Sequence, residues 1–260
     1  MFTRTELQRA LDADELLLIY QAQVDMRTGK PVGVECAIRW RHPEQGLLHA
    51  MKFVNDVPPA GLARDYMRFI VRTATRQMAR WRSASVPFGR AAVNVWPISI
   101  GRDLIDDTLS AASDTGIPPG DIEIESQPEA VYGPDIFKVL QDFRDAGLRV
   151  ALDDFGEGNI HFTNMRDAPF DVVKLPVLFV KRAGAVYDDT VIAAAVGFAR
   201  SIGAATVAEG VETVAIRDRV RELGCDIGQG YLWSQQVPGD ELPGVLRSIR
   251  ADGASAKPVA

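Results

Sequence analysis

The sequence predicts an α/β fold: a TIM-like (β/α)8 barrel of mostly parallel strands, in which one strand is free to run antiparallel. Apolar, β-branched runs alternate with amphipathic stretches along the 260-residue chain, a pattern typical of consecutive βα units. Glycines stand where the expected helices should end before the next strand, at Gly116, Gly147, Gly203 and Gly224. Because eight strand-like runs are present, a closed barrel is favoured over an open sheet.

The expected elements follow in chain order. Strands are expected at residues 16–24, 32–40, 91–96, 121–125, 148–153, 172–175, 205–209 and, briefly, 226–228. Helices are expected at residues 6–13, 65–82, 100–113, 134–146, 190–201, 213–222 and 241–249. We expect residues 1–250 to form one barrel domain and residues 251–260, which are mostly small and polar, to form a disordered tail. On this view the chain is either a stand-alone protein or an excised domain.

Composition narrows the class of protein. Hydrophobic residues make up 47% and charged residues 25%, which suits a soluble globule with a sizeable core. The net charge of −6 and the lack of a long basic run argue against duplex nucleic acid as a main partner. Cys36 and Cys225 show no paired spacing, and the sequence has neither a signal peptide nor an apolar run that could span a bilayer. We therefore expect a cytoplasmic protein without a membrane segment.

Charged and amide side chains fall within or at the ends of the expected strands. They are Glu35, Asn94, Glu125, Asp153, Asp154, Lys174 and Glu209. Since the carboxyl ends of barrel strands face one mouth, we expect these residues to converge. Clusters of oxygen ligands suit Mg²⁺ or Mn²⁺ rather than zinc. Five carboxylates and one lysine leave a charge of −4, which two divalent cations would neutralise.

Each member of this set also has a purely structural interpretation. A single acid at a strand end is most often a helix N-cap or a surface acid. Lys174 alone could be a lysine whose stem covers apolar surface while its ammonium stays in water. The joint pattern favours a metal site, because so many polar groups at successive strands are hard to explain separately.

The segments around these residues resemble the EAL family, which hydrolyses cyclic di-GMP to the linear dinucleotide. Residues 19–25 (IYQAQVD) resemble the YQPIVD strand of the family, and residues 35–43 (ECAIRWRHP) resemble its EALxRWxHP signature. Further matches are VNV at 93–95, IEIE at 122–125, ALDDFG at 151–156, VKL at 173–175, AEGVET at 208–213 and GCDIGQGY at 224–231. The resemblance extends from about Leu7 to Leu246.

This resemblance implies a two-metal phosphodiesterase with cyclic di-GMP as substrate. Glu35, Asn94, Glu125 and Asp153 would hold one ion, and Asp153, Asp154 and Glu209 the other. Glu209, Lys174 and Asp154 would be the catalytic residues, with Lys174 orienting and acidifying the attacking water.

The resemblance also implies which residues bind the substrate. Gln21 and Arg39 would contact it, and Gln229 would help to hold the water network. The planar guanidinium of Arg39 suits a phosphate, although a structural ion pair is its alternative role. The resemblance further implies a homodimer formed near the loop after Asp154. Regulatory input would come from a partner protein, from the expression level or from another domain.

The sequence departs from the family around the loop that follows DDFG. ECA replaces EAL at residues 35–37 but keeps the metal-binding glutamate. Pro128 stands where the family has an acid that supports the loop, and residues 157–161 read EGNIH, Glu157 to His161, instead of TGYSS. Trp96 follows Val95 where the family has a different residue. Loss of a residue that supports the metal ligands typically lowers metal affinity or activity by about 10–100-fold.

Three functions stay open. The first is a cyclic di-GMP phosphodiesterase that is slow or needs a partner, and it is favoured because the full set of metal and catalytic residues is kept. The second is a catalytically inactive receptor that binds cyclic di-GMP and signals by contact. The third is a protein-interaction domain without a nucleotide, against which Gln21 and Arg39 both argue.

Overall fold

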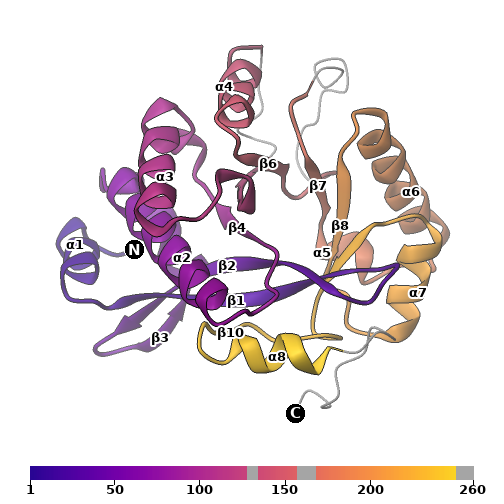
Figure 1. Cartoon of the computed structure of the whole chain (residues 1–260), viewed down its shortest axis with the longest axis horizontal. Helices are drawn as coiled ribbons and strands as arrows, with labels where there is room; N and C mark the ends of the chain where they lie inside the picture. Colours follow the sequence, from indigo (N-terminus) through magenta and orange to yellow (C-terminus); the bar gives the residue numbers. More distant parts are fainter. Residues whose placement is uncertain (128–133, 157–167, 250–260) are drawn as a thin grey trace.

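The computed structural model describes residues 1–127, 134–156 and 168–249 (Figure 1). Pro128, the segment 157–161 and the expected tail at 251–260 lie outside the described residues. None of the described helices is both long and apolar enough to cross a bilayer.

Eight strands of the described chain close into a barrel (Figure 1). In order around the barrel they are β1 (Leu16–Asp25), β2 (Pro31–His42), β4 (Arg90–Asn94), β5 (Ile122–Ser126), β6 (Arg149–Leu152), β7 (Val172–Leu175), β8 (Ala205–Glu209) and β9 (Ile227–Gln229). β1 runs antiparallel to both β2 and β9, and the other neighbouring strands of the ring are parallel. The predicted TIM-like barrel with one antiparallel strand is confirmed.

Two short strands extend the sheet beyond the prediction. β3 (Gly46–His49) pairs antiparallel with the end of β2, and β10 (Val237–Pro238) pairs antiparallel with β1. β3 is mostly exposed and β10 has only two residues, so neither forms the apolar run that marks a buried strand in a sequence. β10 matters for the site, because it fastens the segment that precedes it to the wall of the barrel.

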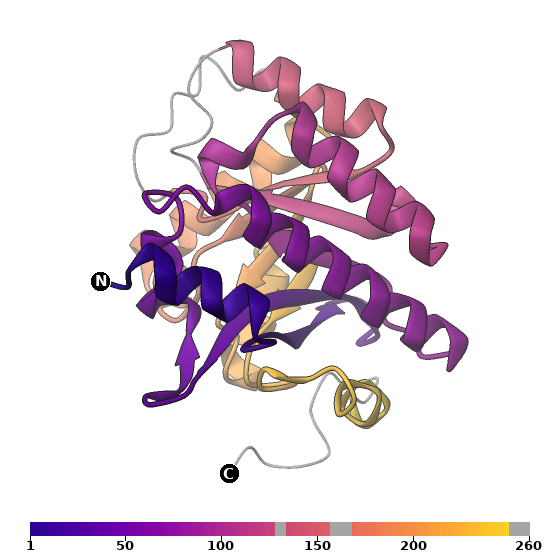
Figure 2. The ribbon, with the colours of Figure 1, turned by 90° about the vertical axis from the view of Figure 1, so that its left-hand side faces the viewer.

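The helices lie outside the ring of strands, and α2 and α3 run side by side over one flank (Figure 2). They are α1 (Arg4–Asp12), α2 (Ala63–Ser83), α3 (Arg102–Thr115), α4 (Pro134–Asp145), α5 (Val177–Val180), α6 (Val186–Ser201), α7 (Val214–Glu222) and α8 (Leu242–Ser248). Single 3₁₀ turns occupy Ala50–Lys52, Val54–Asp56, Pro97–Ser99 and Pro119–Asp121.

Three of the expected helices, α1, α2 and α6, begin earlier than predicted, and the early starts of α1 and α6 each have a physical reason. α1 starts at Arg4 because Thr3 and Glu6 form a reciprocal capping box. α6 starts at Val186, and its first turn carries Asp188 and Asp189, whose charges are favourable near a helix N-terminus. The predicted start at residue 190 followed the apolar periodicity alone. α5 was not predicted, because its four residues cover only one helical turn.

The interior of the barrel is built in layers that position the site. Four strands contribute a buried apolar layer of Ala151, Val172, Val207 and Ile227. Because side chains in a strand alternate between faces, the residue two positions later points to the same side. Those residues are Asp153, Lys174, Glu209 and Gln229. The polar site therefore rests directly on an apolar floor, one pleat further toward the mouth.

Candidate functional site

Lys174 lies at the centre of the carboxylate cluster. It is the third residue of β7, and its side chain is 0% exposed. Its Nζ lies 2.6 Å from Glu209 Oε1, 2.8 Å from Glu125 Oε1, 3.2 Å from Asp153 Oδ1 and 3.7 Å from Glu35 Oε1. The structure therefore brings together acids from four regions of the sequence and excludes a surface role for this lysine.

Asn94 connects two of these carboxylates. Its Nδ2 donates hydrogen bonds to Glu35 Oε1 and Glu125 Oε2, both at 2.9 Å. The register explains the contact, since Asn94 pairs with Glu125 across β4 and β5 while Glu35 pairs with Ala92 on the other side of β4. Glu35 lies in the middle of β2 rather than at a strand end, because β2 continues into its pairing with β3.

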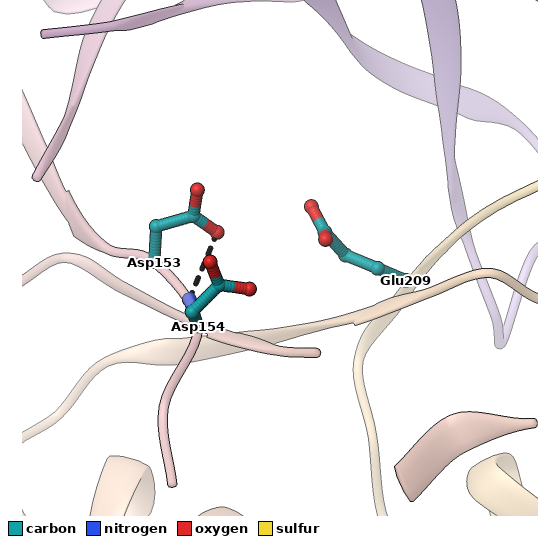
Figure 3. A group of neighbouring side chains, drawn as sticks. All are labelled: Asp153, Asp154 and Glu209. Carbon is teal, nitrogen blue, oxygen red and sulfur yellow. Dashed lines mark hydrogen bonds between the residues drawn. The ribbon is translucent and has the colours of Figure 1, made fainter. Parts of the chain in front are cut away.

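Asp153 and Asp154 follow β6 and face Glu209, the last residue of β8 (Figure 3). One carboxylate oxygen from each residue can lie within 4.8 Å of the other two. Asp154 has a φ of 45°, which is uncommon for a residue other than glycine, and its N–H donates to Asp153 Oδ1 at 3.0 Å. This turn lets two consecutive acids point toward the same space.

Glutamines of the antiparallel side join the acidic cluster. Gln229 Nε2 donates to Glu35 Oε2 and, at 3.2 Å, to Gln21 Oε1. Gln229 Oε1 accepts from Gln23 Nε2 at 3.0 Å, and Gln21 Nε2 donates to the Ser234 carbonyl at 2.9 Å. The predicted substrate-side residues Gln21 and Gln229 are therefore neighbours in one hydrogen-bonded row.

Burial and charge shift the pKa values in this cluster. Burial raises the pKa of Glu209 to about 8, and it raises the pKa of Glu125 well above its usual range, although Lys174 opposes both changes. Burial also acts to raise the pKa of Glu35, but Lys174 and two amide hydrogen bonds outweigh it, so this pKa is lowered. Burial acts to lower the pKa of Lys174, but the surrounding carboxylates outweigh it and raise that pKa. Lys174 is therefore a fixed cation.

The chemistry of the donor set fits divalent cations that prefer oxygen. The site contains carboxylates and one asparagine amide, and no histidine or cysteine of the described residues joins the acids that could hold an ion. Glu125 Oε1 is buried and accepts no hydrogen bond, although it lies 2.8 Å from Lys174 Nζ. One lysine cannot balance five carboxylates, so a bound cation would be needed to keep Glu125 and Glu209, whose pKa values are raised, in their charged form. Mg²⁺ and Mn²⁺ suit such a site.

The mouth of the barrel divides into two chambers. The acidic chamber, of about 370 Å³, is lined among others by Gln21, Glu35, Asp153, Asp154, Lys181, Glu209, Gln229, Tyr231 and Gln236. The apolar chamber, of about 410 Å³, is lined among others by Glu35, Arg39, His49, Met51, Val54, Ile70, Asn94, Trp96 and Gln236. A ligand with separate anionic and flat apolar parts could occupy both.

Arg39 lies in the apolar chamber, away from the main group of acids. It is 4% exposed, and it donates from Nη1 to the Ile38 carbonyl at 2.7 Å and from Nη2 to Gln236 Oε1. It forms no salt bridge with any carboxylate among residues 1–127, 134–156 and 168–249, although Glu35 acts on it electrostatically from a longer distance. The alternative role of Arg39 as a structural ion pair is therefore not supported within the described chain.

Several polar residues in and below the mouth were not predicted. Gln23 could have been found, because it stands two residues after Gln21 and so shares its face of β1. The same period could have revealed Glu123, which lies two residues before Glu125 and forms a buried ion pair with Arg90 at 2.7 Å. No sequence pattern could have revealed Gln236, since it is a single polar residue before a two-residue strand.

Comparisons with known proteins agree with this geometry. The profile of the EAL domain matches residues 4–236. The chain is 32% identical over 249 residues to the cyclic di-GMP phosphodiesterase PA2567 of Pseudomonas aeruginosa, covering 94% of this chain and 42% of that protein. It is also 32% identical to the cyclic di-GMP phosphodiesterase NbdA of the same organism, covering 96% and 32%. The chain thus spans between about a third and two fifths of the length of these two relatives.

Solved structures share the fold. A complex of the PaMucR phosphodiesterase with c-di-GMP has a TM-score of 0.86 and 28% identity, and the match covers 92% of this chain and 98% of that one. The EAL domain of Mycobacterium smegmatis DcpA has a TM-score of 0.76 and 26% identity, covering 90% and 99%. Since the domain profile covers nearly the whole sequence and the barrel matches, the chain belongs to the EAL domain family.

Proposed function

We propose that this chain is a metal-dependent phosphodiesterase that hydrolyses cyclic di-GMP to linear pGpG. The observation that carries the proposal is the convergence of four carboxylates on the buried Lys174 at the mouth of the barrel. The names of two relatives, both cyclic di-GMP phosphodiesterases, support the choice of reaction. The c-di-GMP complex of PaMucR supports the choice of ligand.

The cluster would hold two cations, Mg²⁺ or Mn²⁺. Glu35, Asn94, Glu125 and Asp153 would bind one, and Asp153, Asp154 and Glu209 the other. Bound together, the two ions would supply the Lewis acidity that activates a water and stabilises the phosphoryl oxygens.

The reaction opens one of the two phosphodiester linkages. The oxygen of a water molecule forms a bond to phosphorus, the bond from phosphorus to the 3′ oxygen breaks, and that oxygen takes up a proton. The product is a linear dinucleotide with a 5′-phosphate, and no oxidant or co-substrate other than water is needed.

The side chains of this protein position the reacting groups. Lys174 keeps its proton, so it acts as a hydrogen-bond donor and a fixed charge for the attacking water or a phosphoryl oxygen. Asp154 and Glu209 face one another across the same space. Gln229 is held by both Gln21 and Gln23, so its amide stays aimed at Glu35.

The test is hydrolysis of cyclic di-GMP by the purified chain with Mg²⁺ or Mn²⁺, followed by chromatography of the nucleotides. We expect linear pGpG from the wild type and none from Glu35→Ala. Calorimetry with cyclic di-GMP and Ca²⁺ measures binding in parallel. Binding without any product would contradict the phosphodiesterase proposal and identify a receptor instead, whereas no binding would contradict both.

A further inference from the structure

Arg39 is a buried cation that forms no salt bridge with any described residue, and the carboxylate of Glu35 acts on it only from a longer distance. Its side chain is 4% exposed, and both of the hydrogen bonds it donates there go to neutral oxygens. The buried Nε has no hydrogen-bond partner. A buried charge that lacks a partner of opposite charge is costly. Because Arg39 lines the apolar chamber, an anionic group of a ligand in that chamber can supply the missing charge.

Gln236 stands where the two chambers meet. Gln236 and Glu35 are the residues that line both chambers in the described part of the mouth. The oxygen of the Gln236 side chain accepts from Arg39 Nη2, so its neutral amide reaches across the mouth to the guanidinium.

The segment that carries Gln236 is held on both sides. After it, Val237 pairs with Tyr20 of β1, and Trp81 Nε1 of α2 donates to the Gly239 carbonyl at 2.7 Å. Before it, Ser234 accepts hydrogen bonds from β1, at its carbonyl from Gln21 and at Oγ from the Ala22 N–H at 3.2 Å. The position of the amide is therefore fixed by the barrel wall and not by an isolated loop.

We propose that Gln236 is a positioning residue, which orients Arg39 toward the phosphate of cyclic di-GMP that is not hydrolysed. This inference rests on the proposed function, since it assigns the reacting phosphate to the acidic chamber and the second phosphate to Arg39. The proposed role requires that the side chain of Gln236 be uncharged. A carboxylate at this position would satisfy the guanidinium and compete with the phosphate, whereas an amide aligns Arg39 and leaves its charge to the ligand.

The substitution Gln236→Glu tests this directly, because it keeps the length of the side chain and adds one negative charge. The matched control is Gln235→Glu, which adds the same charge at an exposed neighbouring residue that makes no hydrogen bond to Arg39 in the described structure. A third variant, Gln236→Met, removes the acceptor without adding charge. Binding of cyclic di-GMP is measured by calorimetry with Ca²⁺, with chromatography to check that the ligand stays intact.

We expect Gln236→Glu to raise the Kd about tenfold or more, because an interaction with a charged group is lost. We expect about threefold for Gln236→Met and less than about twofold for Gln235→Glu. In the hydrolysis assay, the effect of Gln236→Glu should fall on KM and leave kcat within about threefold, since Gln236 touches none of the acids around Lys174. Thermal unfolding of each variant checks the fold. If Gln236→Glu does not fold, the Kd of Gln236→Met tests the role of Gln236 instead.

Equal Kd values for Gln236→Glu and Gln235→Glu would overturn the inference, as would a loss confined to kcat. A wild type that binds without hydrolysing would contradict only the proposed reaction, because the Kd comparison still tests Gln236. A wild type that does not bind would contradict both.

Discussion

The acidic chamber and the apolar chamber share Glu35 and Gln236, but the buried charged groups around them differ in sign and in their partners. In the acidic chamber and just beneath it, a single buried lysine lies among four carboxylates and leaves an excess of negative charge. In the apolar chamber, the hydrogen-bond partners of a single buried arginine among the described residues are all neutral. The first arrangement suits cations and the second suits an anion. A ligand that carries phosphates together with flat bases matches both chambers at once.

The largest effect is expected in the acidic chamber. Glu209→Ala should lower kcat by on the order of 10³-fold or more, because it removes a carboxylate that faces Asp153 and Asp154. Binding of cyclic di-GMP should be kept, since Glu209 is not part of the apolar chamber. Hydrolysis and calorimetry measure the two separately. Glu222→Ala, an exposed acid of α7, is the control, and wild-type turnover of Glu209→Ala would refute its assignment.

Loss of the central lysine should affect both activity and stability. Lys174→Met leaves buried carboxylates without their cation, so we expect a loss of about 3–5 kcal/mol of unfolding free energy in a chelator such as EDTA. Added Mn²⁺ should raise the Tm of this variant by more than that of the wild type, because the ion then replaces the missing positive charge. Equal Tm gains in both proteins would mean that the ion binds away from Lys174.

A smaller effect is expected in the apolar chamber. Trp96 lines this chamber, and its ring packs edge-on against Tyr66 with centroids 6.3 Å apart. If it stacks on a guanine, Trp96→Ala should raise KM about tenfold and change kcat little. Ile98→Ala, an exposed apolar residue two positions later, is the control. A fall in kcat with an unchanged KM would instead indicate that Trp96 supports the metal-binding acids and does not stack on a guanine.

The smallest effect concerns the segment after Glu125. Replacing Pro128 by Glu together with Gln127 by Thr restores the residues that the family resemblance expects there, so turnover should rise by up to about tenfold. The hydrolysis assay compares the double variant with the wild type. An unchanged rate would show that this departure does not limit activity.

Strand periodicity predicted the part of the molecule that repeats. The eight barrel strands follow from the alternation of apolar runs with helical stretches, and the convergence of Glu125, Asp153 and Glu209 follows from the acids that end three of these runs. Boundaries shifted where that pattern ends, so Val95 and Trp96 fall outside β4.

The apolar chamber shows why the rest could not be predicted. It is assembled from contacts between distant residues, and no local pattern reveals that Gln236 meets Arg39 across 197 positions. The resemblance to a family identified Arg39 but not its neutral partner. The expected homodimer and regulatory partner stay predictions.

We propose that the acids around Lys174 bind two divalent cations, and the measurement that tests this is equilibrium titration of Mn²⁺ into the metal-free chain with saturating cyclic di-GMP. We predict two Mn²⁺ ions per wild-type chain and one fewer for Glu209→Ala, with Glu222→Ala unchanged. A wild type that binds no Mn²⁺, or a Glu209→Ala variant that binds as many Mn²⁺ ions as the wild type, would show that this two-metal site is wrong.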